Sequence, residues 1–113
     1  GASGIVVSNH GGRVLDHCPA TAEVLPEIVD AVGGKMTIFV DGAIRSGMDM
    51  FKALALGADA VLIGRPFVTT VYGGGEEGVQ LYVQKLKAEL ADTMRMCGAH
   101  SLAEIKRSML FGF

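Results

Sequence analysis

Residues 36–66, MTIFVDGAIRSGMDMFKALALGADAVLIGRP, contain the pattern that decides the fold. Two apolar runs, Met36 to Val40 and Ala60 to Ile63, enclose a glycine-containing loop and a helical pattern. Neither run alternates between apolar and polar residues, as is typical of strands that are buried on both faces. The spacing of Ser46 and Asp49 is that of a capping box, which starts a helix. This stretch therefore predicts a strand, a loop, a helix and a second strand.

The sequence before this stretch predicts the same order of elements. Another apolar run, Ile5 to Ser8, is followed by a loop and a helical pattern. Pro26 suits the first position of this helix, and Gly33 with Gly34 suits its end. The three runs begin 24 to 31 residues apart. Helical connections predict parallel strands, either as consecutive units of a (β/α) barrel or as an open doubly wound sheet.

Two helical patterns follow the last predicted strand. The longer one extends from about Glu76 to Cys97, and its apolar residues are spaced for one buried stripe. The residues of this stripe are Val79, Val83, Leu86, Leu90 and Met94. Ser101 and Glu104 have the spacing of a second capping box. We therefore expect a short closing helix, which carries Leu102, Ile105 and Met109.

The length of the chain limits how much of a barrel it can form. A complete (β/α)8 barrel needs about 250 residues, whereas this chain has 113 residues and ends on the apolar stretch Leu110–Phe113. Three strands do not close a barrel. We therefore expect residues 1–113 to be the carboxy-terminal part of a larger α/β barrel domain, with about three β/α units.

Composition and charge exclude several classes of partner. The formal net charge is −2 at pH 7, and no cluster of Lys and Arg predicts binding to nucleic acid or to an anionic membrane. No uncharged run approaches the roughly 18 to 20 residues that span a bilayer, and no targeting segment is recognisable, so we expect a cytoplasmic protein. Cys18 and Cys97 lack the spacing of a metal site, which favours two reduced thiols.

Glycines and charged side chains gather in the loops that follow the three strands. These loops are Asn9–Arg13, Asp41–Gly47 and Gly64–Pro66. Ligands of α/β folds bind at the carboxyl ends of the strands, where such loops meet. Glycine-rich turns allow backbone N–H groups to converge on an anion, to which Arg45 and Arg65 add charge-assisted hydrogen bonds. Together with the positive end of the helix near Ser46, the second and third loops predict a phosphate site.

The loop after the first strand carries different chemistry. His10 can take up a proton, and the Arg13 guanidinium can hold a carboxylate through two hydrogen bonds. A single histidine is more often structural, and a single arginine is more often a solvated surface charge. Their shared loop nevertheless favours a catalytic pair. His17 and His100 lack such a setting, so we expect them to be structural or solvated.

Several segments of the chain resemble a known family. The segments GASGIVVSNHGGRVLD, DGAIRSG, ALGADAVLIGRP and MRMCGAHSLAEI are similar to the FMN-dependent α-hydroxy acid oxidases and dehydrogenases, which include glycolate oxidase and lactate oxidase. SNHGGR is the most specific segment, because the other glycine and arginine motifs are shared with further FMN barrels. The resemblance implies strands six to eight of a (β/α)8 barrel, FMN as the cofactor and no metal.

The same resemblance implies a role for each loop residue. His10 corresponds to the catalytic base, and Arg13 corresponds to the group that binds the substrate carboxylate. The residues that correspond to the binding region for the FMN phosphate and ribityl chain are Asp41, Gly42, Arg45, Gly64 and Arg65. The implied activity is the oxidation of a small 2-hydroxy acid to the 2-oxo acid.

Two other functions remain open. Another FMN barrel, such as a flavin-dependent isopentenyl diphosphate isomerase, would use the same phosphate loops, but the segment from His10 to Arg13 distinguishes it. The third possibility is a self-associating part-barrel without activity. The family takes a lysine, tyrosines and an aspartate of its active site from earlier strands, which this chain does not contain. We therefore expect the chain alone to be inactive and to form a homo-oligomer through its open sheet edges.

The chain departs from the family pattern at three positions. Val14 stands where a glutamine is usual, and His17 stands where a glycine is common. Ala43 replaces the second glycine of a D-G-G segment. If the backbone has a positive φ at this position, alanine costs roughly 1 kcal/mol.

Overall fold

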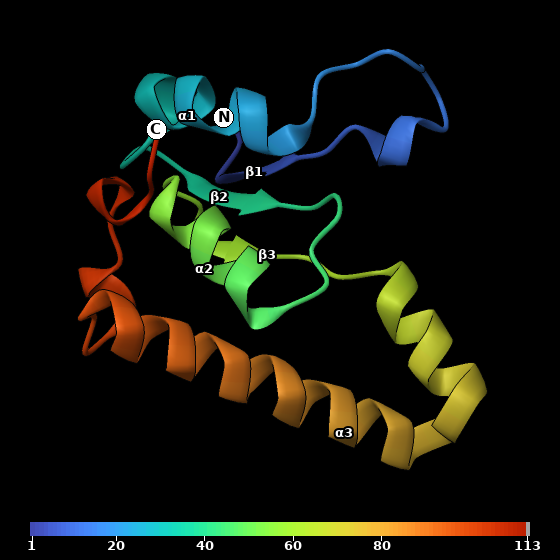
Figure 1. Ribbon diagram of the computed structural model, residues 1–113. Helices are drawn as coiled ribbons and strands as arrows, with labels where there is room; N and C mark the ends of the chain where they lie inside the picture. Colours follow the sequence, from blue (N-terminus) through green and yellow to red (C-terminus); the bar gives the residue numbers. More distant parts are fainter. Residues whose placement is uncertain (113) are drawn as a thin grey trace.

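The computed structural model describes residues 1–112, which form an α/β structure around three parallel strands (Figure 1). The strands lie side by side in sequence order, as β1 (Gly4–Val7), β2 (Thr37–Val40) and β3 (Ala60–Val61). Val40 pairs with both Val7 and Val61, so the three strands end at the same edge of the sheet. The predicted α/β class, with parallel strands joined by helices, is confirmed.

Two helices pack on one face of this sheet. α1 (Thr21–Val32) and α2 (Gly47–Ala55) contribute Leu25 and Ala53 to a buried cluster, which also contains Val7, Ile38 and Val40 of the strands. Burial of these apolar side chains is the main source of stability in this part of the molecule.

The opposite face of the sheet carries Val6, Phe39 and Ala60, which are aligned by the strand register. Val6 is 48% exposed, and Leu62, which follows β3, is 43% exposed. No helix within residues 1–112 covers these side chains. The strands are therefore apolar on both faces, as predicted, but this chain buries only one face.

The first helix begins earlier than predicted, at Thr21 instead of Pro26. Ala20 has no side-chain oxygen to cap this helix, so the sequence gives no familiar start signal there. Instead, the Glu23 carboxylate accepts a hydrogen bond from the Ala20 N–H at 2.7 Å. Pro26 lies inside the helix, within its second turn.

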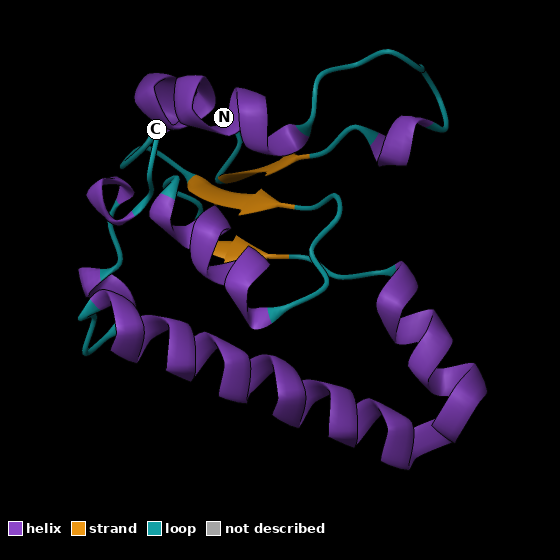
Figure 2. Cartoon of the chain, viewed as in Figure 1, coloured by secondary structure: helices purple, strands orange, loops and turns teal. Residues whose placement is uncertain are grey.

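The last helix, α3, also begins earlier than predicted. It extends over Arg65–Cys97 and bends at Gly75, where φ is 55° and ψ is −139°. The part after the bend agrees with the predicted helix from Glu76 to Cys97. The part before the bend was not predicted. Figure 2 shows how the longer part of α3 runs back past α2.

The predicted apolar stripe of α3 is buried only towards its end. Leu86 is buried, and Leu90 and Met94 pack against a cluster around Phe51 of α2. Val83, in contrast, is 48% exposed. The stripe is therefore partly confirmed, because α2 is long enough to cover only the second half of it.

The prediction of a short closing helix is wrong. Two separate 3-10 turns, Leu102–Glu104 and Arg107–Met109, take its place. Ser101 caps neither turn, and the Glu104 carboxylate accepts a hydrogen bond from the His100 N–H at 2.8 Å. Ile105 is nevertheless buried, so the apolar side chains of this segment still close the core beside α2.

Candidate functional site

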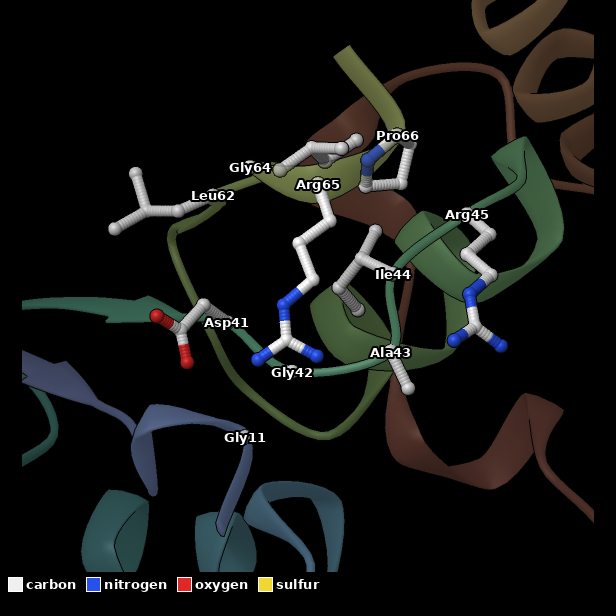
Figure 3. A pocket seen from close by; sticks show the side chains of 11 residues that line it. Gly11, Asp41, Gly42, Ala43, Ile44, Arg45, Leu62, Gly64, Arg65 and Pro66 are labelled. Carbon is white, nitrogen blue, oxygen red and sulfur yellow. The ribbon is translucent and has the colours of Figure 1, made fainter. Parts of the chain in front are cut away.

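A hollow of about 180 Å³ lies at the carboxyl ends of the strands. The loops after β2 and β3 form most of it, and Gly11 from the loop after β1 completes it (Figure 3). All five residues that the sequence assigned to the cofactor line this hollow, namely Asp41, Gly42, Arg45, Gly64 and Arg65. The structure therefore brings these residues together.

Several backbone N–H groups of the hollow have no acceptor within residues 1–112. They belong to Gly42, Ala43, Ile44 and Gly64. Gly64 also precedes the first turn of α3 and gives it no side-chain cap. The first N–H groups of a helix and its dipole both attract anions. The hollow thus combines free donors from a loop with the positive end of α3.

The predicted contribution from the helix after Ser46 is wrong. The Ser46 side chain accepts a hydrogen bond from the Asp49 N–H, and Asp49 accepts from the N–H groups of Arg45 and Ser46. The Gly47 N–H donates to Glu89 at 2.8 Å. Because these donors are already used, the start of α2 offers little to a ligand. The start of α3 takes its place.

The two arginines of the hollow have no acidic partner within 4 Å in the described part of the chain. In Figure 3 the Arg65 side chain extends across Gly42 towards Gly11, while Arg45 lies on the other side of the segment Ala43–Ile44. Neither guanidinium therefore forms an ion pair in the described residues, and both lie beside free N–H donors. This arrangement suits an anionic group.

Gly11 is the point at which the first loop meets Arg65. A Cβ atom at Gly11 would lie 2.5 Å from Nη2 of Arg65, and its φ of 62° lies in the left-handed region. Only glycine fits this contact without displacing the guanidinium.

The loop after β2 also has a left-handed backbone. Gly42 has a φ of 98° and Ala43 has a φ of 59°. Thr21, at the start of α1, holds this loop through a hydrogen bond of 2.5 Å from its hydroxyl to the Asp41 carbonyl. The positive φ makes Ala43 a strained residue, with a cost of roughly 1 kcal/mol.

His10 and Arg13 lie beside the hollow but do not line it. His10 begins the 3-10 turn His10–Gly12, whose N-cap, Asn9, accepts a hydrogen bond from the Gly11 N–H at 2.9 Å. The side chains of His10 and Arg13 are exposed and form no hydrogen bond with another described residue. The structure thus places the pair next to the anion-binding loops without fixing the orientation of either side chain.

The remaining sequence predictions concern residues away from the hollow. Cys18 and Cys97 are exposed free thiols, as predicted. His17 is exposed beside Asp16, and His100 contacts Glu104 at 3.1 Å. Within residues 1–112, no His, Cys, Asp and Glu side chains are grouped as a metal site, and no helix has the length and apolar character to cross a membrane.

The sequence profile of the FMN-dependent dehydrogenases matches residues 1–111. The chain belongs to this family. L-lactate oxidase of Roseobacter sp. (strain GAI101) is 50% identical over 113 residues, which are 100% of this chain and 30% of that protein. Glycolate oxidase of Spinacia oleracea is 51% identical over 108 residues, which are 96% of this chain and 29% of that protein.

A solved structure of mandelate oxidase with benzoyl-formic acid is also similar. It is 48% identical and has a TM-score of 0.91, and the match covers 95% of this chain and 32% of that one. The chain thus spans about 30% of the length of the curated relatives it matches. The resemblance drawn from the sequence is confirmed, and so is FMN as the cofactor of the family.

Sequence reasoning missed two features that shape this hollow, namely the start of α3 and the contact between Thr21 and the loop after β2. Pro66, in the first turn of α3, is a usable start signal for that helix, but the glycines at positions 73–75 disfavour a continuous helix from there. The role of Thr21 had no local signal, because its partner, Asp41, lies 20 residues away.

Proposed function

We propose that this chain is part of an enzyme that oxidises a small 2-hydroxy acid to the 2-oxo acid with FMN. One observation carries the proposal, namely the convergence of free N–H groups and two unpaired arginines on one hollow. The activities named for the relatives, on lactate, glycolate and mandelate, support the same class of substrate.

The hollow fits the phosphate end of FMN better than the whole cofactor. Its volume of about 180 Å³ is below the roughly 300 to 1,000 Å³ of a complete ligand pocket. Gly42 and Gly64 would bind the phosphate through their N–H groups, and Arg65 would neutralise its charge. Arg45 and Asp41 would complete the phosphate and ribityl region. The flavin ring would extend beyond these residues.

The loop after β1 supplies the groups for the substrate. Arg13 would hold the carboxylate of the 2-hydroxy acid, and a neutral His10 would take up a proton of the substrate. Bound FMN supplies the group that accepts the two electrons. Gly11 and Gly12 keep the loop free of bulky side chains, so the base can approach the substrate closely.

The uncovered face of the sheet suggests how the chain fits into a larger molecule. We propose that β1, β2 and β3 are strands six to eight of a (β/α)8 barrel, in which Val6, Phe39 and Leu62 face the barrel interior. Further strands would cover these side chains and supply the rest of the active site. Without them, the 113-residue chain should associate with itself and lack activity.

A flavin-dependent isomerase would share the phosphate loops but would need no base beside a carboxylate-binding arginine. The segment from His10 to Arg13 and the oxidase relatives therefore favour oxidation of a 2-hydroxy acid.

The test is the FMN content of the full-length protein after removal of each arginine. Arg65→Ala and Arg45→Ala should each weaken FMN binding by about 10- to 100-fold, because a charge-assisted hydrogen bond contributes about 1.5–3 kcal/mol. The rate per bound flavin should change little. Arg107→Ala, at an exposed position away from the hollow, is the control. Full FMN occupancy of both variants at low cofactor concentration would refute the proposed phosphate site.

A further inference from the structure

Tyr82 of α3 contacts both arginine-bearing segments of the hollow without lining the hollow itself. Its hydroxyl donates a hydrogen bond of 2.9 Å to the Arg45 carbonyl. Its ring forms an edge-to-face pair with the ring of Phe67, with centroids 5.0 Å apart and an interplanar angle of 66°. Phe67 lies two residues after Arg65. One side chain therefore joins the loop after β2 to the start of α3.

The bend at Gly75 makes this contact possible. It turns the chain back, so that Tyr82 in the second part of α3 meets Phe67 in the first part. At Gly78 the two parts are so close that a Cβ atom would lie 2.5 Å from the Thr70 carbonyl oxygen. The position of Tyr82 relative to the start of α3 is therefore fixed by direct packing.

The environment of Tyr82 keeps its hydroxyl a donor. Burial raises its pKa above the ordinary value of 10.0, an effect that nearby Lys85 partly opposes. The phenol thus remains protonated at neutral pH, which its hydrogen bond to a carbonyl requires.

Glu89, further along α3 than Tyr82, forms a second contact with the segment that follows β2. Its carboxylate accepts the Gly47 N–H at 2.8 Å and also binds Lys85. These hydrogen bonds, led by that of Lys85, lower the pKa of Glu89, so it is charged at neutral pH. A Cβ atom at Gly47 would lie 2.2 Å from the Leu90 nitrogen, so the loop here touches the backbone of α3.

We propose that Tyr82 is a positioning residue for the phosphate of FMN, and that Glu89 assists it. By holding the Arg45 carbonyl and the Phe67 ring, Tyr82 sets the distance between the two arginine-bearing segments. Glu89 fixes the end of the same loop. The inference rests on the proposed FMN site. It adds that affinity for the phosphate depends on two side chains that do not touch the cofactor.

The first test compares FMN with riboflavin, which lacks the phosphate, in the full-length apoprotein. Tyr82→Phe removes only the hydroxyl. It should raise the Kd for FMN by about 3- to 10-fold, the equivalent of one hydrogen bond. The Kd for riboflavin should stay the same. Tyr72→Phe, at a tyrosine of α3 that is 89% exposed, should change neither value.

The results distinguish an error in the proposed phosphate site from an error in the role of Tyr82. If the wild-type protein bound riboflavin as tightly as FMN, the proposed phosphate site itself would be wrong. If the wild-type protein preferred FMN but Tyr82→Phe weakened both ligands equally, Tyr82 would have only a structural role. Unchanged FMN binding in Tyr82→Phe would also overturn the inference.

The second test uses Glu89, for which a conservative variant exists. Glu89→Gln keeps an oxygen that can accept the Gly47 N–H, whereas Glu89→Ala removes it. The alanine variant should lose several-fold in FMN affinity, and the glutamine variant should recover most of this loss. Glu77→Ala, an exposed position of α3, is the control. Equal losses in both Glu89 variants would overturn the role of this hydrogen bond.

Discussion

The loop after β2 differs from the loop after β1 in how firmly this chain holds it. Thr21, Tyr82 and Glu89 each form a hydrogen bond with the backbone of residues 41–47. The loop after β1 has mainly local hydrogen bonds, and the one that reaches furthest joins the Asn9 amide to the Pro19 carbonyl at 3.3 Å. The anion-binding half of the site is thus assembled within this chain. The loop after β1, which carries His10 and Arg13 and is proposed to perform the chemistry, is held less firmly.

The substitution His10→Ala should separate these two halves most clearly. In the full-length enzyme we expect turnover of glycolate or lactate to fall by about 10²- to 10⁴-fold, because a general base is lost. FMN content, measured by flavin absorbance per protein, should stay the same. His17→Ala is the control, because its side chain is 95% exposed. Full turnover of His10→Ala at saturating substrate would contradict the assignment of the base.

Arg13→Lys should have a smaller effect on the same half of the site. The ammonium group keeps the charge but loses the paired hydrogen bonds of the guanidinium, so KM should rise by about 10-fold with a lesser loss of kcat. Steady-state kinetics with two 2-hydroxy acids would measure this. Arg107→Lys should behave like the wild type. An unchanged KM for Arg13→Lys would remove Arg13 from the substrate site.

Sequence reasoning succeeded where the signal was local. The apolar runs predicted parallel strands joined by helices, and the glycines and arginines that follow two of these runs predicted a phosphate site. The family resemblance then named five of the residues that line the hollow. It failed at the start of α1 because Ala20 carries no capping oxygen, and at the start of α3 because Gly73–Gly75 resemble a loop. The roles of Tyr82 and Glu89 depend on contacts 37 and 42 residues away, which no local pattern encodes.

Ala43→Gly changes the loop after β2, and we expect it to increase stability modestly. Glycine adopts a φ of 59° without strain, so the free energy of unfolding should rise by about 0.5–1 kcal/mol. Urea denaturation would measure it. Ala31→Gly is the matched control, because it lies in α1 and should lower stability by about 0.5–1 kcal/mol. A loss of stability in Ala43→Gly would show that the methyl group packs favourably.

The smallest effect concerns Glu104, far from both loops. Hydrogen bonds from the backbone and then the side chain of His100 lower the pKa of Glu104 below 4.5. Its contribution to stability is therefore present above pH 4.5 and is lost as the pH falls through the lower pKa of the folded state. Glu104→Gln should reduce this acid sensitivity in urea unfolding at several pH values, whereas Glu77→Gln should not. Identical pH dependence in Glu104→Gln and the wild type would exclude the contribution.

The bend at Gly75 restricts where insertions and deletions can be accepted during evolution. Each residue added to the part of α3 before the bend would move the rest of the helix by about 1.5 Å and rotate it by about 100°. Tyr82 would then lose both Phe67 and the Arg45 carbonyl. Insertions should therefore be rejected between Arg65 and Gly75 but accepted in the exposed loop from Val14 to Pro19. Among relatives, this α3 segment should keep a constant number of residues even where its sequence differs.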